Sequence, residues 1–203
     1  MTQIARPNCG NCGAELPGRL AQARMITCTY CGTTSVLRDN VFEMAGEGGE
    51  MQEAPSLIQL GQSLRIERRD LMPVGHARFS YGRGHWDEFW CVDGAGEGCW
   101  LSADEGDYAL EHDLPRDRWP DSRRLSLGAS IELLGETYTV TEVETGTCLA
   151  VRGEFPEELE VGEAHLYYAL SAQRGAMATY ERWDGGEGWS HGRWIDPWDV
   201  KAA

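Results

Sequence analysis

The sequence predicts a mostly β protein, in which a small cysteine-bearing module precedes a β-rich body of two related repeats, barrel- or sandwich-like in form. Three observations lead to this fold class. Two C-x-x-C-G motifs lie within the first 40 residues. Short runs rich in aromatic and β-branched residues, bounded by Gly, Pro and Asp, recur along the rest of the chain. The stretch LGQSLRI at residues 60–66 is similar to LGASIEL at residues 127–133, which indicates an internal repeat.

The paired cysteines predict a metal site. Two C-x-x-C turns separated by 15 residues match four-thiolate zinc spacing, and a glycine follows each second cysteine. Disulfides are disfavoured because we expect a reducing, cytoplasmic compartment. A thioredoxin-like redox site is also disfavoured, since it needs one C-x-x-C motif within a βαβ pattern, and the sequence has no such pattern. Four thiolates leave no open position, so the ion is expected to fold the module rather than to catalyse. We therefore expect a zinc ribbon with one structural zinc ion held by Cys9, Cys12, Cys28 and Cys31.

The organisation along the chain follows from these patterns. Residues 1–40 are expected to form the ribbon, with strands at 19–27 and 33–37, and residues 41–56 a Gly- and Glu-rich linker. The first β repeat is expected over residues 57–120. The second is expected over residues 121–203 and ends in a Trp-rich hairpin and tail. Strands are predicted at residues 86–92, 137–143, 147–151 and 165–170, and no segment shows a sustained helical period.

The chain is strongly acidic. Its formal net charge is −15, and because the first 40 residues carry four arginines against two carboxylates, the remainder carries −17. An acidic body repels the phosphate backbone, so nucleic acid is disfavoured as its partner. A cationic partner is favoured electrostatically, whether a basic protein face, a polyamine or a metal ion. Acidity that serves only solubility is the alternative.

Tryptophans supply the candidate binding surface. Trp86, Trp90 and Trp100, together with Asp87 and Glu88, have the composition of a groove in which aromatic faces and carboxylates bind an amine. The other interpretation, which the shortage of other large apolar residues favours, places these tryptophans in the core.

A second aromatic cluster lies near the C-terminus. Residues 183–198 hold four tryptophans around a glycine-rich, hairpin-like stretch. Such a tail is expected to pack onto the body or onto a partner, since large exposed apolar patches mark interaction sites. Trp189, Trp194 and Trp198 are therefore further candidates for partner binding.

The sequence contains little that indicates catalysis. The sequence has no nucleophile elbow, phosphate loop or dinucleotide fingerprint. Cys91, Cys99 and Cys148 lie in apolar strand contexts, which are typical of buried, inert thiols. An enzyme of unrecognised type is the alternative, with carboxylates and a histidine such as His85 or His191 at a cleft between the repeats.

Several motifs, taken in order, resemble a known family. The ribbon is followed by Trp-Asp-Glu-Phe-Trp at residues 86–90, Cys-Trp-Leu at 99–101 and Gly-Glu-Phe-Pro at 153–156. Residues 57–196 thereby resemble the bacterial domain-of-unknown-function family 4178, to which an N-terminal ribbon is a frequent addition. Residues 171–175 depart from the family's Ser-Arg-Glu-like element. The resemblance implies a bacterial cytosolic accessory protein, in a family whose genes lie beside those for polyamine synthesis and phage-shock-type membrane proteins.

The sequence therefore predicts a non-enzymatic, zinc-containing adaptor or accessory protein that binds a cationic partner or a protein complex, linked to bacterial envelope stress or polyamine metabolism. A nucleic-acid-binding ribbon is a further alternative, because its four arginines do not decide what it binds. The N-terminus has no signal pattern, and the chain has no apolar run of about 20 residues that would span a membrane. A cytoplasmic location is expected.

Overall fold

The computed structural model describes residues 7–19, 22–52 and 56–203, and antiparallel strands dominate it, which confirms the mostly β prediction. In these residues no helix has the length and apolar character needed to cross a membrane. The elements in chain order are β1 (Met25–Thr27), β2 (Thr33–Arg38), β3 (Val41–Glu47), β4 (Leu64–Ile66), β5 (Arg69–Ser80), β6 (His85–Asp93), β7 (Gly98–Asp104), β8 (Asp107–Asp113), the 3-10 helices η1 (Arg116–Arg118) and η2 (Ser122–Arg124), β9 (Ser130–Leu133), β10 (Glu136–Phe155), β11 (Ala164–Ser171), η3 (Gln173–Gly175), β12 (Ala176–Trp183), β13 (Gly186–Ile195), η4 (Pro197–Asp199) and β14 (Val200–Ala202).

The N-terminal ribbon is a small antiparallel sheet in which β2 lies between β1 and β3. Of the strand predicted at residues 19–27, the structure shows β1 alone, and residues 20–21 lie outside the described chain. β3 falls within residues 41–56, the range predicted as a linker, so residues 41–47 are part of the ribbon's sheet instead. Residues 53–55 of that range are not described. The glycines after β3 pack on β10, where the Val151 N–H donates to the Gly48 carbonyl at 2.8 Å.

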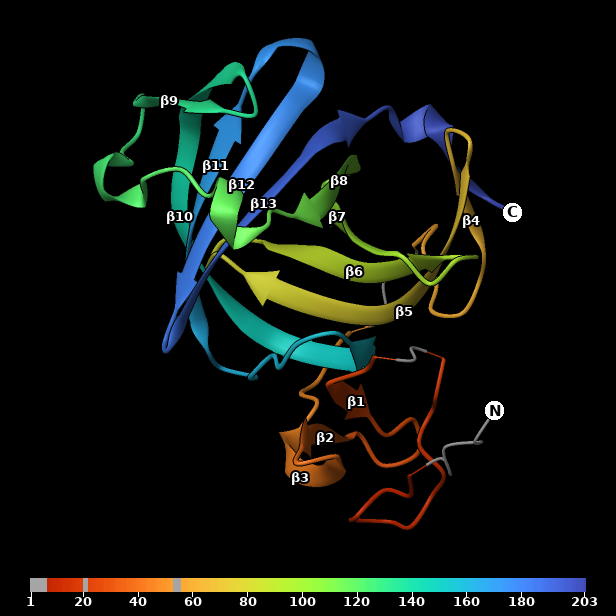
Figure 1. The fold of residues 1–203 in the computed structure, drawn as a ribbon. Helices are drawn as coiled ribbons and strands as arrows, with labels where there is room; N and C mark the ends of the chain where they lie inside the picture. The colour runs from red at the N-terminus through yellow and green to blue at the C-terminus, as the bar shows by residue number, and fades with distance from the viewer. Residues whose placement is uncertain (1–6, 20–21, 53–55) are drawn as a thin grey trace.

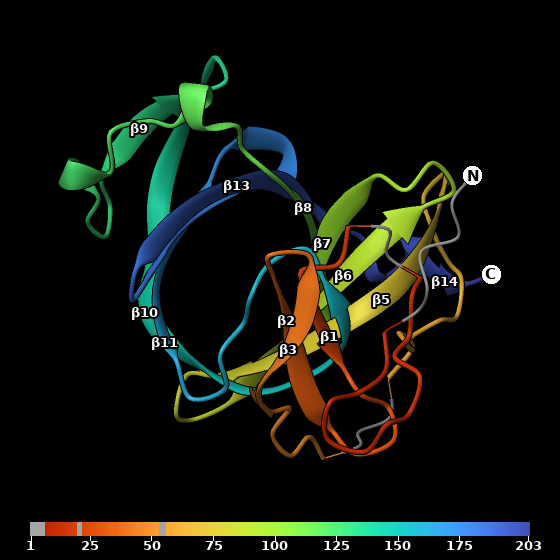
Figure 2. The same ribbon diagram turned by 60° about the horizontal axis from the view of Figure 1, so that its bottom comes forward.

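Eight strands of the body pair into a ring (Figures 1 and 2). The pairing order is β5-β6-β7-β8-β13-β12-β11-β10, and β10 pairs again with β5. β10 makes this closure by changing partner along its length: it pairs with β11 up to Thr147 and with β5 from Thr147 to Gly153. Register shifts on both halves mark bulges, which bend a strand and increase its twist. Of the two predicted forms, the ring is the barrel-like one.

Two successive meanders build this ring. β4–β8 and β9–β13 each run as five antiparallel neighbours, and the first strand of each lies off the ring beside β5 or β10. The 67-residue offset matches β4 with β9 and the start of β5 with the start of β10. Residues 99–101, which the sequence also aligns with residues 166–168 at this offset, lie on the fourth strand of the first meander, whereas residues 166–168 lie on the third strand of the second. The repeat boundaries at 57–120 and 121–203 stay a prediction.

Apolar side chains fill both faces of the ring wall. Outside, β4 and β14 cover Phe89 and Leu101, whereas β9 and the connection before it cover Val140 and Leu170. A third core includes Phe155 and joins the ring to the ribbon. The predicted C-terminal tail ends in η4 and β14, and β14 pairs with β4. Residues that alternate with these outward-facing apolar side chains point into the ring.

Candidate functional site

Four cysteines converge in the ribbon. The Sγ atoms of Cys9, Cys12, Cys28 and Cys31 all lie within 4.8 Å of one another. The Sγ atoms of Cys9 and Cys31 are 3.6 Å apart, and those of Cys12 and Cys28 are 3.7 Å apart. A tetrahedron with metal–sulfur bonds of about 2.3 Å has sulfur–sulfur edges of about 3.8 Å. These four residues can therefore hold a metal ion without rearrangement.

Local turns position the four sulfurs. The N–H groups of Gly13 and Gly32 donate to the carbonyls of Cys9 and Cys28, each at 2.9 Å. Both glycines have positive φ, 75° and 74°, a conformation that a Cβ would disfavour. The Thr33 hydroxyl lies 3.3 Å from the Cys31 sulfur and 3.0 Å from the Asn11 side-chain nitrogen, so polar groups surround the exposed side of the cluster.

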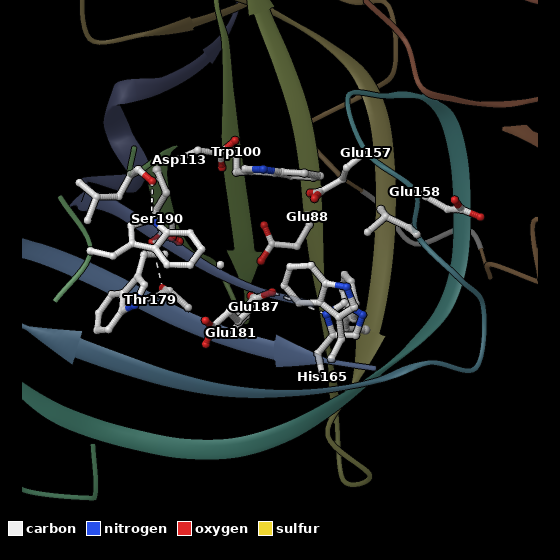
Figure 3. A pocket seen from close by; sticks show the side chains of 18 of the residues that line it. Glu88, Trp100, Asp113, Glu157, Glu158, His165, Thr179, Glu181, Glu187 and Ser190 are labelled. Carbon is white, nitrogen blue, oxygen red and sulfur yellow. Dashed lines mark hydrogen bonds and ion pairs between the residues drawn. The ribbon is translucent and has the colours of Figure 1, made fainter. Parts of the chain in front are cut away.

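A cavity of about 350 Å³ lies inside the ring, lined by side chains from both meanders (Figure 3). Aromatic rings form much of its wall, and its polar groups are carboxylates, one imidazole and the hydroxyls of Thr179 and Ser190. None of the lysines or arginines in the described ranges lines it. Its tryptophans are Trp86, Trp100, Trp119, Trp183 and Trp189, and its carboxylates are Glu88, Glu111, Asp113, Glu157, Glu158, Glu181 and Glu187.

Glu88 and Glu111 are the carboxylates that the protein holds most firmly. Glu88 accepts hydrogen bonds from Trp86 Nε1 at 2.9 Å and from the Ser102 hydroxyl at 2.8 Å. The Glu111 Oε1 atom accepts from the hydroxyls of Thr179 at 2.9 Å and Ser190 at 2.8 Å. All four donors are neutral, so they orient the carboxylates without cancelling their charge.

The surroundings disfavour the charged form of both carboxylates. Burial, followed by the charge of Glu111, raises the pKa of Glu88 to about 8. Burial also raises the pKa of Glu111. A carboxylate in a low dielectric needs a cation or a proton to offset its lost hydration. A cation beside Glu88 or Glu111 would therefore favour the charged form of that carboxylate.

A loop between β10 and β11 brings further carboxylates to the cavity. Burial, with the charge of Asp113 as the next cause, raises the pKa of the half-buried Glu157 to about 7. Glu158 is exposed and pairs with Arg38 of the ribbon, with the Arg38 Nη2 atom 3.0 Å from its Oε1. Asp113 and Glu187 are also exposed, so the acidic lining extends from the buried Glu111 to the solvent.

His165 is the imidazole of the cavity wall. It is 6 % exposed, stacks on Trp183 with ring centroids 5.5 Å apart and lies edge-on to Phe79. Its ring nitrogens lie 3.4 Å from a Glu163 oxygen and 3.6 Å from a Glu181 oxygen. These are ion-pair distances, and neither nitrogen has a hydrogen-bond partner of good geometry among the described residues. Burial alone would lower the pKa of His165, but Glu181 and then Glu163 outweigh it and raise the pKa.

The carboxylates do not converge on one point. Across the described ranges, the four cysteines are the only group of three or more potential metal ligands found close enough to share an ion. The cavity carboxylates instead surround a space large enough for a small organic molecule, since ligand pockets begin at about 300 Å³. Aromatic walls and dispersed carboxylates suit an organic cation better than a metal ion.

Half of the tryptophan and carboxylate residues predicted to bind a partner lie in the cavity. Trp86, Glu88, Trp100 and Trp189 line it. Trp86 also stacks on Phe79, with ring centroids 5.1 Å apart, so the groove and core interpretations both describe part of its environment.

The other half lie elsewhere. Asp87 is hydrogen-bonded to Arg78 Nε at 2.7 Å and His76 Nε2 at 2.9 Å. Burial alone would raise its pKa, but these partners lower it to about 2. Trp90 is buried in the core next to Trp100. Trp194 and Trp198 are 49 % and 85 % exposed.

Sequence reasoning missed the polar residues on the inward faces of β8 and β12. Thr179, Glu181 and Trp183 alternate along β12 and all line the cavity, as do Glu111 and Asp113 on β8. The alternation is visible in the sequence, but polar residues in such a pattern normally face solvent. Neither His85 nor His191 lines the cavity, and the histidine that does is His165.

Comparison with known proteins gives one match. The model of a family described as a domain of unknown function, DUF4178, matches residues 59–197. No curated protein and no solved structure matches the chain.

Proposed function

The chain belongs to the DUF4178 family, and we propose from its cavity that it is an accessory protein that binds a small organic cation, such as a polyamine, inside the ring. The observation that carries this proposal is the lining: seven carboxylates and five tryptophans, with no lysine or arginine from the described residues among them.

Electrostatics favours a cation in this space. The donors that orient Glu88 and Glu111 are neutral. No positive side chain among these donors offsets the negative charge of the deprotonated carboxylates. An ammonium group that displaces their protons would gain charge-assisted hydrogen bonds, each of about 1.5–3 kcal/mol. Contact of its methylene groups with Trp86, Trp100 and Trp183 adds apolar burial, and cation–π contacts add about 0.5–2 kcal/mol. A chain with a formal charge of −15 also attracts cations to its surface.

We assign the metal of the ribbon as zinc. Four thiolates in a tetrahedral arrangement are the donor set of structural zinc sites, and they leave no position for water or substrate. Cys9, Cys12, Cys28 and Cys31 would hold the ion and fix the ribbon's turns. In this proposal the ribbon is structural and the cavity binds the ligand.

The test is a titration of the full, zinc-loaded chain with spermidine and with 1,4-diaminobutane, followed by the fluorescence of the cavity tryptophans. We expect saturable 1:1 binding, with 1,4-butanediol giving no response because it lacks the charge. Glu88→Gln should weaken binding by about tenfold to a hundredfold, the equivalent of one charge-assisted hydrogen bond.

A matched control separates the cavity from the acidic surface. Glu132→Gln removes an exposed carboxylate of β9 that does not line the cavity. It should leave the dissociation constant unchanged. Equal losses in the two variants, or a diol that binds as well as the diamine, would show surface attraction or a neutral ligand and would refute the proposal.

A further inference from the structure

The ribbon and the cavity share one segment of chain. The loop between β10 and β11 supplies Glu157, Glu158 and Leu159 to the cavity lining. The end of β10, directly before this loop, pairs with β1 of the ribbon, where Met25 lies opposite Phe155 and Ile26 opposite Glu154. Figure 1 shows the ribbon below the ring, with β1 next to the end of β10. The elements that fold around the four cysteines therefore also hold the loop.

Backbone and core contacts fasten the loop to β1. The Arg24 N–H donates to the Phe155 carbonyl at 2.9 Å, and the Leu159 N–H donates to the Met25 Sδ at 3.2 Å. Met25, Phe155 and Leu159 are 2 %, 0 % and 8 % exposed and belong to one core cluster with Trp86 and Trp100 of the cavity wall. A change at Met25 would thus reach the cavity through direct packing.

Charged side chains also connect the ribbon to the loop between β10 and β11. Arg38 of the ribbon forms a two-oxygen contact with Glu158, at 3.0 and 3.2 Å. Burial raises the pKa of Glu157, and the positive charge of Arg24 acts in the opposite direction. Ribbon arginines therefore act on both loop carboxylates: Arg38 pairs with Glu158, and the charge of Arg24 works against the raised pKa of Glu157.

We infer that the ribbon is a positioning element of the cation cavity, so that metal binding at the four cysteines and cation binding inside the ring strengthen each other. The inference rests on the proposed function. A ribbon of this size depends on its metal to fold, since a preformed site rarely exists in an unfolded chain. Loss of the metal would unfold β1 and break the contact between Met25 and Leu159. Glu157 and Glu158 would then no longer be held in position at the cavity. By thermodynamic linkage, the cation must then raise the affinity for the metal by the same factor.

The first experiment measures both directions of this coupling in the full chain. Spermidine is titrated into protein loaded with Zn²⁺ and into protein from which a chelator has removed it. Separately, Zn²⁺ affinity is measured by competition with a chromogenic chelator, with and without saturating spermidine. We expect metal removal to weaken spermidine binding by about fivefold to 150-fold, and spermidine to tighten Zn²⁺ binding by the same factor.

Two neighbouring residues of β1 offer a matched pair that works with the metal in place. Met25 faces the loop and ring core, whereas Ile26 faces the ribbon's own core. At saturating Zn²⁺, Met25→Ala should weaken spermidine binding at least fivefold, and Ile26→Ala should leave it within twofold of the unsubstituted chain. This comparison still decides the matter if the metal-free protein does not stay folded.

The outcomes separate this inference from the proposed function. Spermidine binding that is unaffected by both metal removal and Met25→Ala overturns the coupling and leaves the cavity assignment standing. Equal weakening in Met25→Ala and Ile26→Ala would show a general loss of stability and would also overturn it. Absence of any spermidine binding in the zinc-loaded chain refutes the proposed function and the coupling with it.

Discussion

Glu88 shows what an acidic cavity costs the folded protein. It lies between Trp86 and Ser102, with hydrogen bonds from both, yet its pKa is raised to about 8 by burial and by Glu111. A carboxyl whose pKa is higher in the folded than in the unfolded chain binds more protons when folded. The contribution of Glu88 to the free energy of unfolding therefore falls as pH rises from 4.5, the ordinary pKa of a glutamate, to about 8, its pKa in the folded chain. A buried carboxyl of this kind lowers stability at neutral and alkaline pH, a cost that functional sites commonly carry.

The ligand-free chain should consequently lose stability as pH rises from 6 to 9, because Glu88 and Glu157 give up their protons with pKa values of about 8 and 7. Glu88→Gln should reduce that slope and raise the Tm at pH 9, by about 2–4 °C for each kcal/mol gained in a chain of this size. Thermal melts at pH 6 and pH 9 measure both effects. A Glu88→Gln chain that melts below the unsubstituted one at pH 9 would mean that the charge is stabilising.

Cation binding has the opposite pH dependence. An amine displaces protons from Glu88 and Glu157, so its dissociation constant should fall as pH rises from 6 to about 8.5, while alkyl amines remain charged. Titration calorimetry in two buffers of different ionisation enthalpy would measure the protons released. Binding that is independent of pH, with no proton release, would exclude these two carboxyls as ligands of the cation.

At the scale of elements, the position of Trp86 on β6 depends on a glycine of β10, two strands away in the ring. A Cβ on Gly146 of β10 would lie 2.1 Å from the Trp86 ring. The indole therefore occupies the space that any other residue at 146 would fill, and from there its Nε1 orients Glu88.

Gly146→Ala should displace Trp86, lower stability by about 1–3 kcal/mol through overpacking and weaken amine binding about tenfold. Urea denaturation and the fluorescence titration measure the two effects. Gly94→Ala is the control, because Gly94 lies in a turn with open space around its Cβ position. Unchanged binding in Gly146→Ala would show that Trp86 does not shape the site.

The elements also show how far the sequence predicts the fold. Aromatic and β-branched runs located β6 and β11, and two runs at 137–143 and 147–151 proved to be one bent strand, β10. A bulge is not visible in composition, so the ring closure that depends on it was not predictable. The metal site was predictable because C-x-x-C spacing alone brings sulfurs together, whereas the cavity depends on distant strands. Polar residues at alternate positions of β12, such as Glu181, have the pattern of a solvent face and in fact face inward.

At the scale of the whole molecule, the ribbon is expected to be a metal-dependent unit. Elemental analysis of the reduced, purified chain should give one zinc per chain, and Cys28→Ser should lose it, because the remaining three thiolates bind zinc less tightly. Cys148→Ser is the control, since that cysteine is buried in the ring core. A chain without stoichiometric metal, or one whose melting is unchanged by Cys28→Ser, would contradict the assignment of a structural zinc.

The most direct test of the whole account is a crystal structure of the zinc-loaded chain grown with spermidine. The account predicts the amine inside the ring, with nitrogen atoms within hydrogen-bonding distance of Glu88 and Glu111 and its chain against Trp86 and Trp183. An amine found only on the outer surface, or a cavity filled by water at saturating spermidine, would contradict it.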